Sequence, residues 1–167
     1  MGKVNMGRAK RAAEQWRNER PDIDANVMAT IGRLLEAAHL IERTRLMPLA
    51  AQFGLQTGEF DVIAALRRAG EPYQLTPTEL YEALMLSSGA MTSRLDRLER
   101  SGLIERRASA KDRRSVDVCL TQKGADLIDE ILPHHIANEQ DVLKPLSMRE
   151  REQLDRLLDK LIGGVGE

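Results

Sequence analysis

The chain has 167 residues, a length typical of one domain with a substantial core, and only 3% of them are aromatic. The core must therefore be built from leucine, isoleucine, alanine and methionine, which favours helices. No apolar run approaches the roughly 18 residues of a membrane span, and the basic, polar start lacks a secretion signal, so we expect a cytoplasmic protein without a membrane partner. The single cysteine, Cys119, excludes an intrachain disulfide framework and a cysteine-rich zinc site.

Charge is unevenly distributed along the chain, although its formal sum is only −1. Residues 87–118 hold eight basic and five acidic side chains, whereas residues 124–167 hold ten acidic and five basic ones. The first segment suits a negatively charged partner, and the second would be repelled by it. A solvated charged surface without any partner explains the same charges equally well.

The N-terminal part predicts an extension over residues 1–20, with a short helix at 11–19, and then a long helix. That helix covers 26–52 within a dimerisation segment at 21–52, and Pro48 should kink it or end it early. Its apolar residues recur on one face at three- and four-residue spacing: Met28, Ile31, Leu35 and Ala38. The next helix, over residues 59–69, is apolar almost all round and is therefore expected to be buried.

The clearest start signal in the chain precedes a short helix. Thr76 can cap that helix, Pro77 fits its first position, and Glu79 completes a capping box. After a tight turn, Ser87 can cap a second helix over 87–101. Two helices joined in this way predict a helix-turn-helix whose second helix is the recognition helix.

A basic hairpin follows the two helices. Residues 103–107 and 115–120 read as short strands, and the charged loop 108–114 joins them. The hairpin forms a wing over 104–120, so the segment 53–121 is predicted to be a winged helix-turn-helix lobe that binds DNA.

Helical periodicity returns after the lobe, at residues 122–135 and 148–162. The terminal helices, at 21–52 and 122–167, have no local partner once the small lobe has packed its own core. The natural partner is a second subunit, so we expect these segments to form a homodimer.

The recognition helix begins with small and hydrogen-bonding residues, which allow close approach to base edges in the major groove of double-stranded DNA. Basic side chains at the wing tip suit a narrow, electronegative minor groove. The predicted DNA-binding residues are Ser87, Ser88, Gly89, Thr92, Ser93, Arg97, Arg113 and Arg114.

Several runs of the chain carry a resemblance to a known family. The lobe reads SSGAMTSRLDRLE at 87–99, GLIERR at 102–107, DRRS at 112–115 and LTQKG at 120–124. With these runs, the chain resembles the MarR family of bacterial transcriptional regulators over nearly its whole length. The runs at 15–22, 59–68 and 138–143 are similar to the PecS-like, urate-responsive subgroup of that family.

The family resemblance implies an intertwined homodimer whose terminal helices form the interface and whose two recognition helices bind a palindromic site. The subgroup resemblance adds an extra N-terminal helix and a pocket for an anionic purine such as urate or xanthine. It assigns ligand binding to a tryptophan, an aspartate and two arginines, and the matching positions are Trp16, Asp61, Arg94 and Arg106.

Physical reasoning supports two of these four residues. Arg94 falls on the inward side of the recognition helix, where a charge needs a partner. Asp61 lies in the helix that is otherwise apolar, so an ion pair with Arg94 would relieve both groups, and an anion that disturbs this pair would shift the recognition helix. Roles other than ligand binding stay open for these residues. The Asp61–Arg94 pair could be purely structural, Trp16 could serve packing alone, and Arg106 could bind a DNA phosphate.

The histidines and the cysteine give no clear prediction of a metal or redox site. His135 and Glu139 lie one helical turn apart, with His134 adjacent, but a zinc site needs more ligands, so surface histidines are the simpler interpretation. Cys119 has no second cysteine to resolve an oxidised sulfur, which favours burial without chemistry. No phosphate-binding glycine loop, nucleophile elbow or HExxH motif is present, so we expect no enzyme, cofactor or metal.

These patterns together predict a mainly α-helical, winged helix-turn-helix homodimer with a β-hairpin wing. It would repress transcription from a palindromic operator and lose DNA affinity when urate or a related purine binds. Two alternatives remain at this point. One is a regulator of the same type that responds to another organic anion or to oxidation, and the other is a helical dimerisation module without DNA function.

Overall fold

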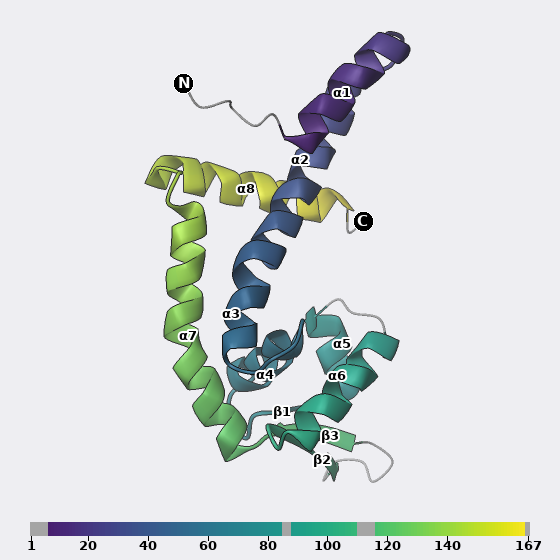
Figure 1. Ribbon diagram of the computed structural model, residues 1–167. Helices are drawn as coiled ribbons and strands as arrows, with labels where there is room; N and C mark the ends of the chain where they lie inside the picture. The colour runs from purple at the N-terminus through teal and green to yellow at the C-terminus, as the bar shows by residue number, and fades with distance from the viewer. Residues whose placement is uncertain (1–6, 85–87, 110–115, 166–167) are drawn as a thin grey trace. The chain divides into compact units, whose positions relative to one another are not determined.

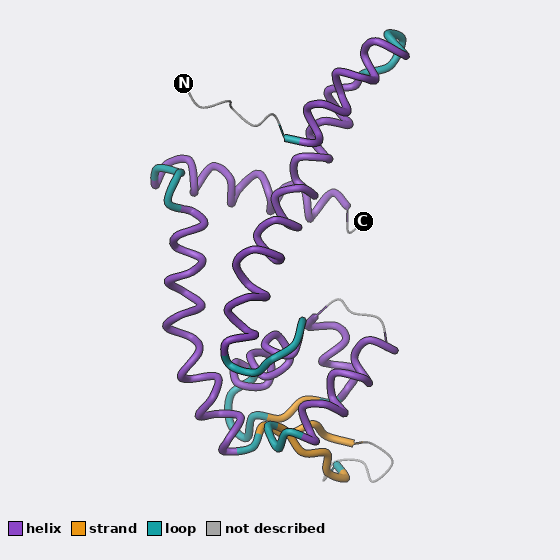
Figure 2. Tube along the Cα trace, viewed as in Figure 1, coloured by secondary structure: helices purple, strands orange, loops and turns teal. Residues whose placement is uncertain are grey.

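The computed structural model describes residues 7–84, 88–109 and 116–165, without the side chains of 88–90 (Figures 1 and 2). These residues are mostly helical and include one small antiparallel sheet. The chain divides into two compact units, Met1–Pro48 and Leu49–Glu167. The second unit contains the expected winged helix-turn-helix.

The first unit is built on two packed helices, α1 (Arg8–Glu19) and α2 (Ala25–Ile41). Small residues let their backbones approach closely, since a Cβ added to Gly32 would lie 2.9 Å from the Cβ of Ala9. The Glu36 carboxylate of α2 accepts the first two backbone N–H groups of α1, at 3.0 and 3.3 Å. These hydrogen bonds hold the pKa of Glu36 below its usual value. The predicted extra N-terminal helix therefore exists and begins three residues earlier than expected.

The interruption expected near Pro48 takes the form of a wide helical turn. A π-helical segment, η1 (Glu42–Leu46), separates α2 from α3 (Met47–Gln52) within the helix predicted at 26–52. Proline has no N–H to donate, and its ring clashes with the carbonyl four residues earlier in a regular α-helix. The wider turn accommodates that ring, and the Met47 N–H donates to the carbonyl five residues before it.

Four helices enclose the core of the second unit: α4 (Glu59–Arg68), α5 (Pro77–Leu84), α6 (Ser88–Arg100) and α7 (Gln122–Leu143). Apolar side chains at helical spacing meet there and exclude water almost completely. The large helical side chains with 0% exposure are Val62, Ile63, Leu66, Leu80, Met91, Leu98, Ile128 and Ile131. Helix α4 is largely buried, as expected, although the side chain of Asp61 is exposed.

The sheet has three strands in the order β1-β3-β2, of which β2 (Ile104–Ala108) and β3 (Val116–Leu120) form the wing. These wing strands lie within one residue of the predicted ones, and Arg106 is paired with Val118 in their antiparallel register. The strand β1 (Gln74–Leu75) was not predicted, because two residues are too few to show alternation. It pairs with the other edge of β3, so that β3 is the central strand.

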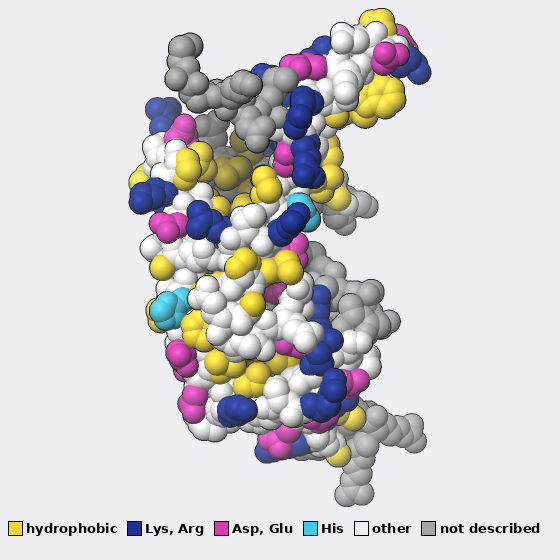
Figure 3. All heavy atoms as spheres, viewed as in Figure 1, with side chains coloured by type: hydrophobic (Ala, Val, Ile, Leu, Met, Phe, Trp, Pro, Cys, Tyr) yellow, Lys and Arg dark blue, Asp and Glu magenta, His cyan; other side chains and the backbone are white. Residues whose placement is uncertain are grey.

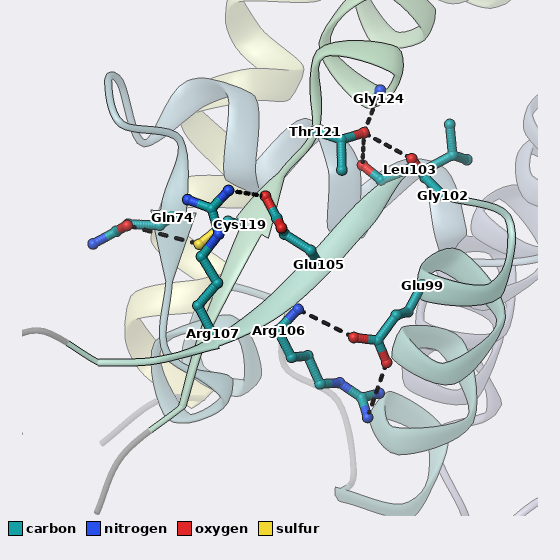
Figure 4. Close-up of polar contacts among 10 residues, drawn as sticks. All are labelled: Gln74, Glu99, Gly102, Leu103, Glu105, Arg106, Arg107, Cys119, Thr121 and Gly124. Carbon is teal, nitrogen blue, oxygen red and sulfur yellow. Dashed lines mark hydrogen bonds and ion pairs between the residues drawn. The ribbon is translucent and has the colours of Figure 1, made fainter. Parts of the chain in front are cut away.

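A compact junction joins the end of α6 to the start of α7 (Figure 4). The hydroxyl of Thr121 donates to the carbonyl oxygens of Gly102 and Leu103, at 2.8 and 3.0 Å, and accepts the Gly124 N–H at 3.1 Å, which caps α7. A Cβ on Gly124 would lie 2.2 Å from the carbonyl oxygen of Leu103. A side chain at position 124 would therefore force this junction apart.

The C-terminal helices are α7 and α8 (Met148–Val165). Helix α7 continues through Pro133 to Leu143 and is longer than the predicted segment 122–135. No residue of α8 is buried. Among the described residues, no helix is long and apolar enough to cross a membrane.

Replacing Thr76 with alanine is expected to lower the free energy of unfolding by about 1 kcal/mol. The predicted capping box is present: the Glu79 carboxylate accepts the Thr76 N–H at 2.7 Å, and the Glu79 N–H donates to the Thr76 hydroxyl at 3.3 Å. Urea denaturation followed by circular dichroism measures the loss. Thr78→Ala, at an exposed position of the same helix, is the control and should cause no loss. Equal stability of the two variants would contradict a capping role.

Candidate DNA-binding and effector site

Helix α6 has one buried side and one open side. Met91, Leu95 and Leu98 point into the core, whereas Thr92 and Ser93 are exposed. This arrangement places hydrogen-bonding side chains on the outer surface of the helix, as a recognition helix requires. Of the other predicted DNA-binding residues, Ser88 and Gly89 lie in the first turn of α6, and Ser87, Arg113 and Arg114 lie outside the described residues.

Charges of both signs share the molecular surface. On the face drawn in Figure 3, Lys and Arg side chains lie among Asp and Glu side chains over the described residues of the second unit. The carboxylates of α6 and β2 are partners of arginines in the same two elements. Two cations of the lobe, Arg106 and Arg107, are thus paired with neighbouring carboxylates, so a count of basic residues overstates the positive charge that is open to DNA phosphates.

Arg97, a predicted DNA-binding residue, has a partner inside the lobe. Its Nε donates to the Glu59 carboxylate at 2.6 Å, and only 6% of the Glu59 side chain is exposed. Glu59 also accepts the N–H of Gln56 at 2.7 Å. This ion pair ties α6 to the first turn of α4. Sequence reasoning missed the pair, although a glutamate at the start of an apolar helix was a usable signal.

The Arg94 side chain packs against the start of α4 rather than pairing with Asp61. A Cβ added to Gly58, which precedes α4 with a positive φ of 74°, would lie 2.2 Å from Cζ of Arg94. Asp61 faces solvent, and no ion pair within 4 Å joins it to Arg94 among the described residues. The expected Asp61–Arg94 pair is therefore wrong for this structure. Exposure keeps the aspartate solvated, so it needs no buried partner.

Arg106 lies on β2 and contacts α6 (Figure 4). Its guanidinium lies 2.6 Å from a carboxylate oxygen of Asp96 and 3.6 Å from one of Glu99. The backbone N–H of Arg106 also donates to Glu99, at 3.1 Å. The neighbouring Arg107 instead pairs with Glu105 of its own strand. Sequence reasoning selected Arg106 but did not foresee its carboxylate partners.

Trp16, the fourth predicted ligand residue, lies on α1 of the first unit. Its side chain is 42% exposed, so it is not a core residue of that unit. Asp61, Arg94 and Arg106 belong to the second unit. The assignment of the four residues to a common ligand remains a prediction.

The contacts of Cys119 and His135 favour structural roles for both residues. Cys119 is buried in β3, and burial raises the pKa of its thiol, which disfavours the reactive thiolate. The ring of His135 stacks on Phe60 at 4.3 Å between centroids, and its Nε2 lies 3.2 Å from Glu139. The described residues contain no group of three or more potential metal ligands of the His, Cys, Asp and Glu types.

Comparison with known proteins gives concordant matches. A sequence profile described as the MarR family matches residues 53–115. The chain is 43% identical over 148 residues to the HTH-type transcriptional regulator PecS of Dickeya dadantii, and the alignment covers 89% of each protein. The resemblance read from the sequence is thereby confirmed over most of the chain.

Two solved structures extend the comparison. A mutant MarR of Escherichia coli, complexed with operator DNA, aligns with a TM-score of 0.71 and 27% identity, covering 87% of this chain and 96% of that one. BpsR of Bordetella bronchiseptica, whose DNA binding is regulated by 6-hydroxynicotinic acid, aligns with a TM-score of 0.70 and 25% identity. That alignment covers 78% of this chain and 91% of BpsR. The winged helix-turn-helix fold is thus shared with DNA-binding regulators.

Proposed function

Since this chain belongs to the MarR family of DNA-binding transcriptional regulators, we propose that it is a homodimeric repressor whose operator affinity is lowered by urate or a related purine. The observation that carries the DNA-binding part is the open side of α6, beside a two-stranded wing. Two such lobes related by dimer symmetry fit a palindrome with half-sites about 34 Å apart. Membership of a family of regulators sets aside the alternative of a dimerisation module without DNA function.

Exposed apolar side chains on the terminal helices support the homodimer. Such side chains recur along one face of α8 at three- and four-residue spacing, and a folded monomer leaves them in water. They are Leu154, Leu157, Leu161, Ile162 and Val165, with exposures between 38% and 80%. Burial of this face against a second copy would give it the contacts that an apolar surface requires.

The effector part of the proposal rests on cations that suit a planar anion. Arg94 and Arg106 each present a guanidinium, which binds carboxylate-like and purine oxygens through paired N–H donors. Trp16 offers an exposed aromatic face for stacking on a heterocycle. The resemblance of the runs at 15–22, 59–68 and 138–143 to the urate-responsive subgroup supports a purine as the ligand. An anion near Asp61 would also repel that carboxylate.

We expect urate to release the protein from its operator, and Trp16→Ala and Arg106→Ala to raise the urate concentration needed by about tenfold or more. The experiment is an electrophoretic mobility shift on a palindromic promoter fragment, with each variant compared with its own urate-free affinity. In the wild-type protein and in Arg106→Ala, quenching of Trp16, the single tryptophan, reports ligand binding directly. Arg68→Ala, at an exposed position of α4, is the control. An unchanged response in both test variants would refute the proposed ligand residues.

A second candidate is regulation by another organic anion. The alignment with BpsR, a protein regulated by 6-hydroxynicotinic acid, favours it. Calorimetric titration with urate, xanthine, 6-hydroxynicotinic acid and an unrelated carboxylate separates the two candidates. Regulation by oxidation has less support, because Cys119 is buried with a raised thiol pKa.

A further inference from the structure

The wing strand β2 is an edge strand, and α6 covers part of its open edge. In the order β1-β3-β2, only one side of β2 pairs with another strand. The outward N–H of Arg106 is not left to water, because it donates to the Glu99 carboxylate at 3.1 Å. A side chain of the recognition helix thus takes the place of a neighbouring strand at the middle of β2.

The same two elements are also joined through charge. Asp96 and Glu99 are three residues apart on α6, so both face β2, and both contact the Arg106 guanidinium. These three side chains are 30–49% exposed. An anion that approaches Arg106 therefore meets two carboxylates that already contact its guanidinium. Binding such an anion requires that they give way.

We propose that Asp96 and Glu99 are positioning residues that fix the wing against the recognition helix through Arg106, and that the anionic effector competes with them for this arginine. The inference rests on the proposed function, because it uses Arg106 as an effector ligand. Under this proposal, operator binding and effector binding oppose each other at Arg106. When Asp96 and Glu99 hold Arg106, the wing stays at a fixed distance from the recognition helix, so that the two can enter adjacent grooves of DNA. When Arg106 binds the anion instead, that distance is no longer fixed.

The Glu105–Arg107 pair offers an internal comparison. It lies on the same strand as Arg106 and joins the same kinds of groups, but both of its members belong to β2. It cannot hold the wing to α6. Neutralising Glu105 removes one negative charge beside Arg106 without removing a link between the wing and the recognition helix.

The test is the double variant Asp96→Asn/Glu99→Gln. Both amides keep an oxygen acceptor, so the Arg106 N–H retains its hydrogen bond while the guanidinium loses its anionic partners. We expect urate affinity, measured by calorimetry, to rise about three- to tenfold and urate-free operator affinity to fall by a similar factor. A merely structural role would lower both affinities together.

Glu105→Gln is the matched control and should change neither affinity by more than about twofold. If both affinities of the double variant fall, or neither changes, the inference is overturned. If wild-type protein does not bind urate, the proposed effector is wrong. The operator affinity of the double variant then decides alone whether Asp96 and Glu99 position the wing. Thermal unfolding identifies a misfolded double variant, and Glu99→Gln alone then replaces it in both measurements.

Discussion

Replacing Leu157 and Leu161 with glutamine is expected to turn the protein into a monomer and to abolish operator binding at working concentrations. Both side chains lie on the apolar face of α8 and are 57% and 40% exposed in the single chain. In a dimer they would be buried, so each substitution loses apolar burial and places an amide in a site without hydrogen-bond partners. Together the two changes should weaken dimerisation by about a hundredfold or more.

The control for this experiment is the double variant Glu152→Gln/Arg156→Gln. These residues lie on a different face of α8, and the pair of substitutions leaves the net charge unchanged, as the leucine pair does. Sedimentation equilibrium measures the oligomeric state, and a mobility shift measures operator binding. A leucine double variant that remains dimeric would show that this face of α8 is not the interface. A control variant that also dissociates would point to the stability of α8 itself.

Replacing Gly124 with alanine is expected to destabilise the second unit by about 2 kcal/mol, within the usual range for overpacking. The new methyl group would lie 2.2 Å from the carbonyl oxygen of Leu103, and that backbone atom cannot rotate away. The shift that relieves the clash also strains the hydrogen bonds of Thr121 to Gly102 and Leu103. Alanine is a better helix former than glycine by up to about 1 kcal/mol, which offsets only part of this loss.

Thermal unfolding by circular dichroism should show the Gly124→Ala effect as a fall of about 4–8 °C in Tm. Gly163→Ala is the matched control, since it is also a helical glycine but has open space where its Cβ would lie. That variant should be as stable as the parent protein or slightly more stable. If both variants gain stability, the junction between α6 and α7 is looser than the structure shows.

Local signals predicted the elements of the lobe well. The capping box at Thr76 and the alternation before Thr121 each depend on residues close together in the chain, and the structure confirms the helices and wing strands that they predicted. The wide turn before Pro48 was expected only as an interruption, because proline shows where a helix is disturbed but not how the backbone adapts. The two-residue strand β1 carries no periodicity to detect.

Long-range pairings account for most of what the sequence did not show about the candidate site. Glu59 and Arg97 are 38 residues apart, and their pairing depends on how α4 and α6 cross rather than on any local pattern. The Asp61–Arg94 prediction failed for a related reason: helical periodicity placed both residues near the core, but the packing left Asp61 in solvent. The partners of Arg106 depend on which side of β2 meets α6.

The central position of β3 has a consequence for mechanical compliance. A strand bonded on both edges resists bending more than a strand bonded on one, because bending it strains two ladders of hydrogen bonds. β3 is bonded to β1 on one edge and to β2 on the other, whereas β2 has a single ladder. Because β1 pairs only with Val118 and Cys119, a wing that follows the contour of a duplex would bend beyond Val118, where a single ladder joins β2 to β3.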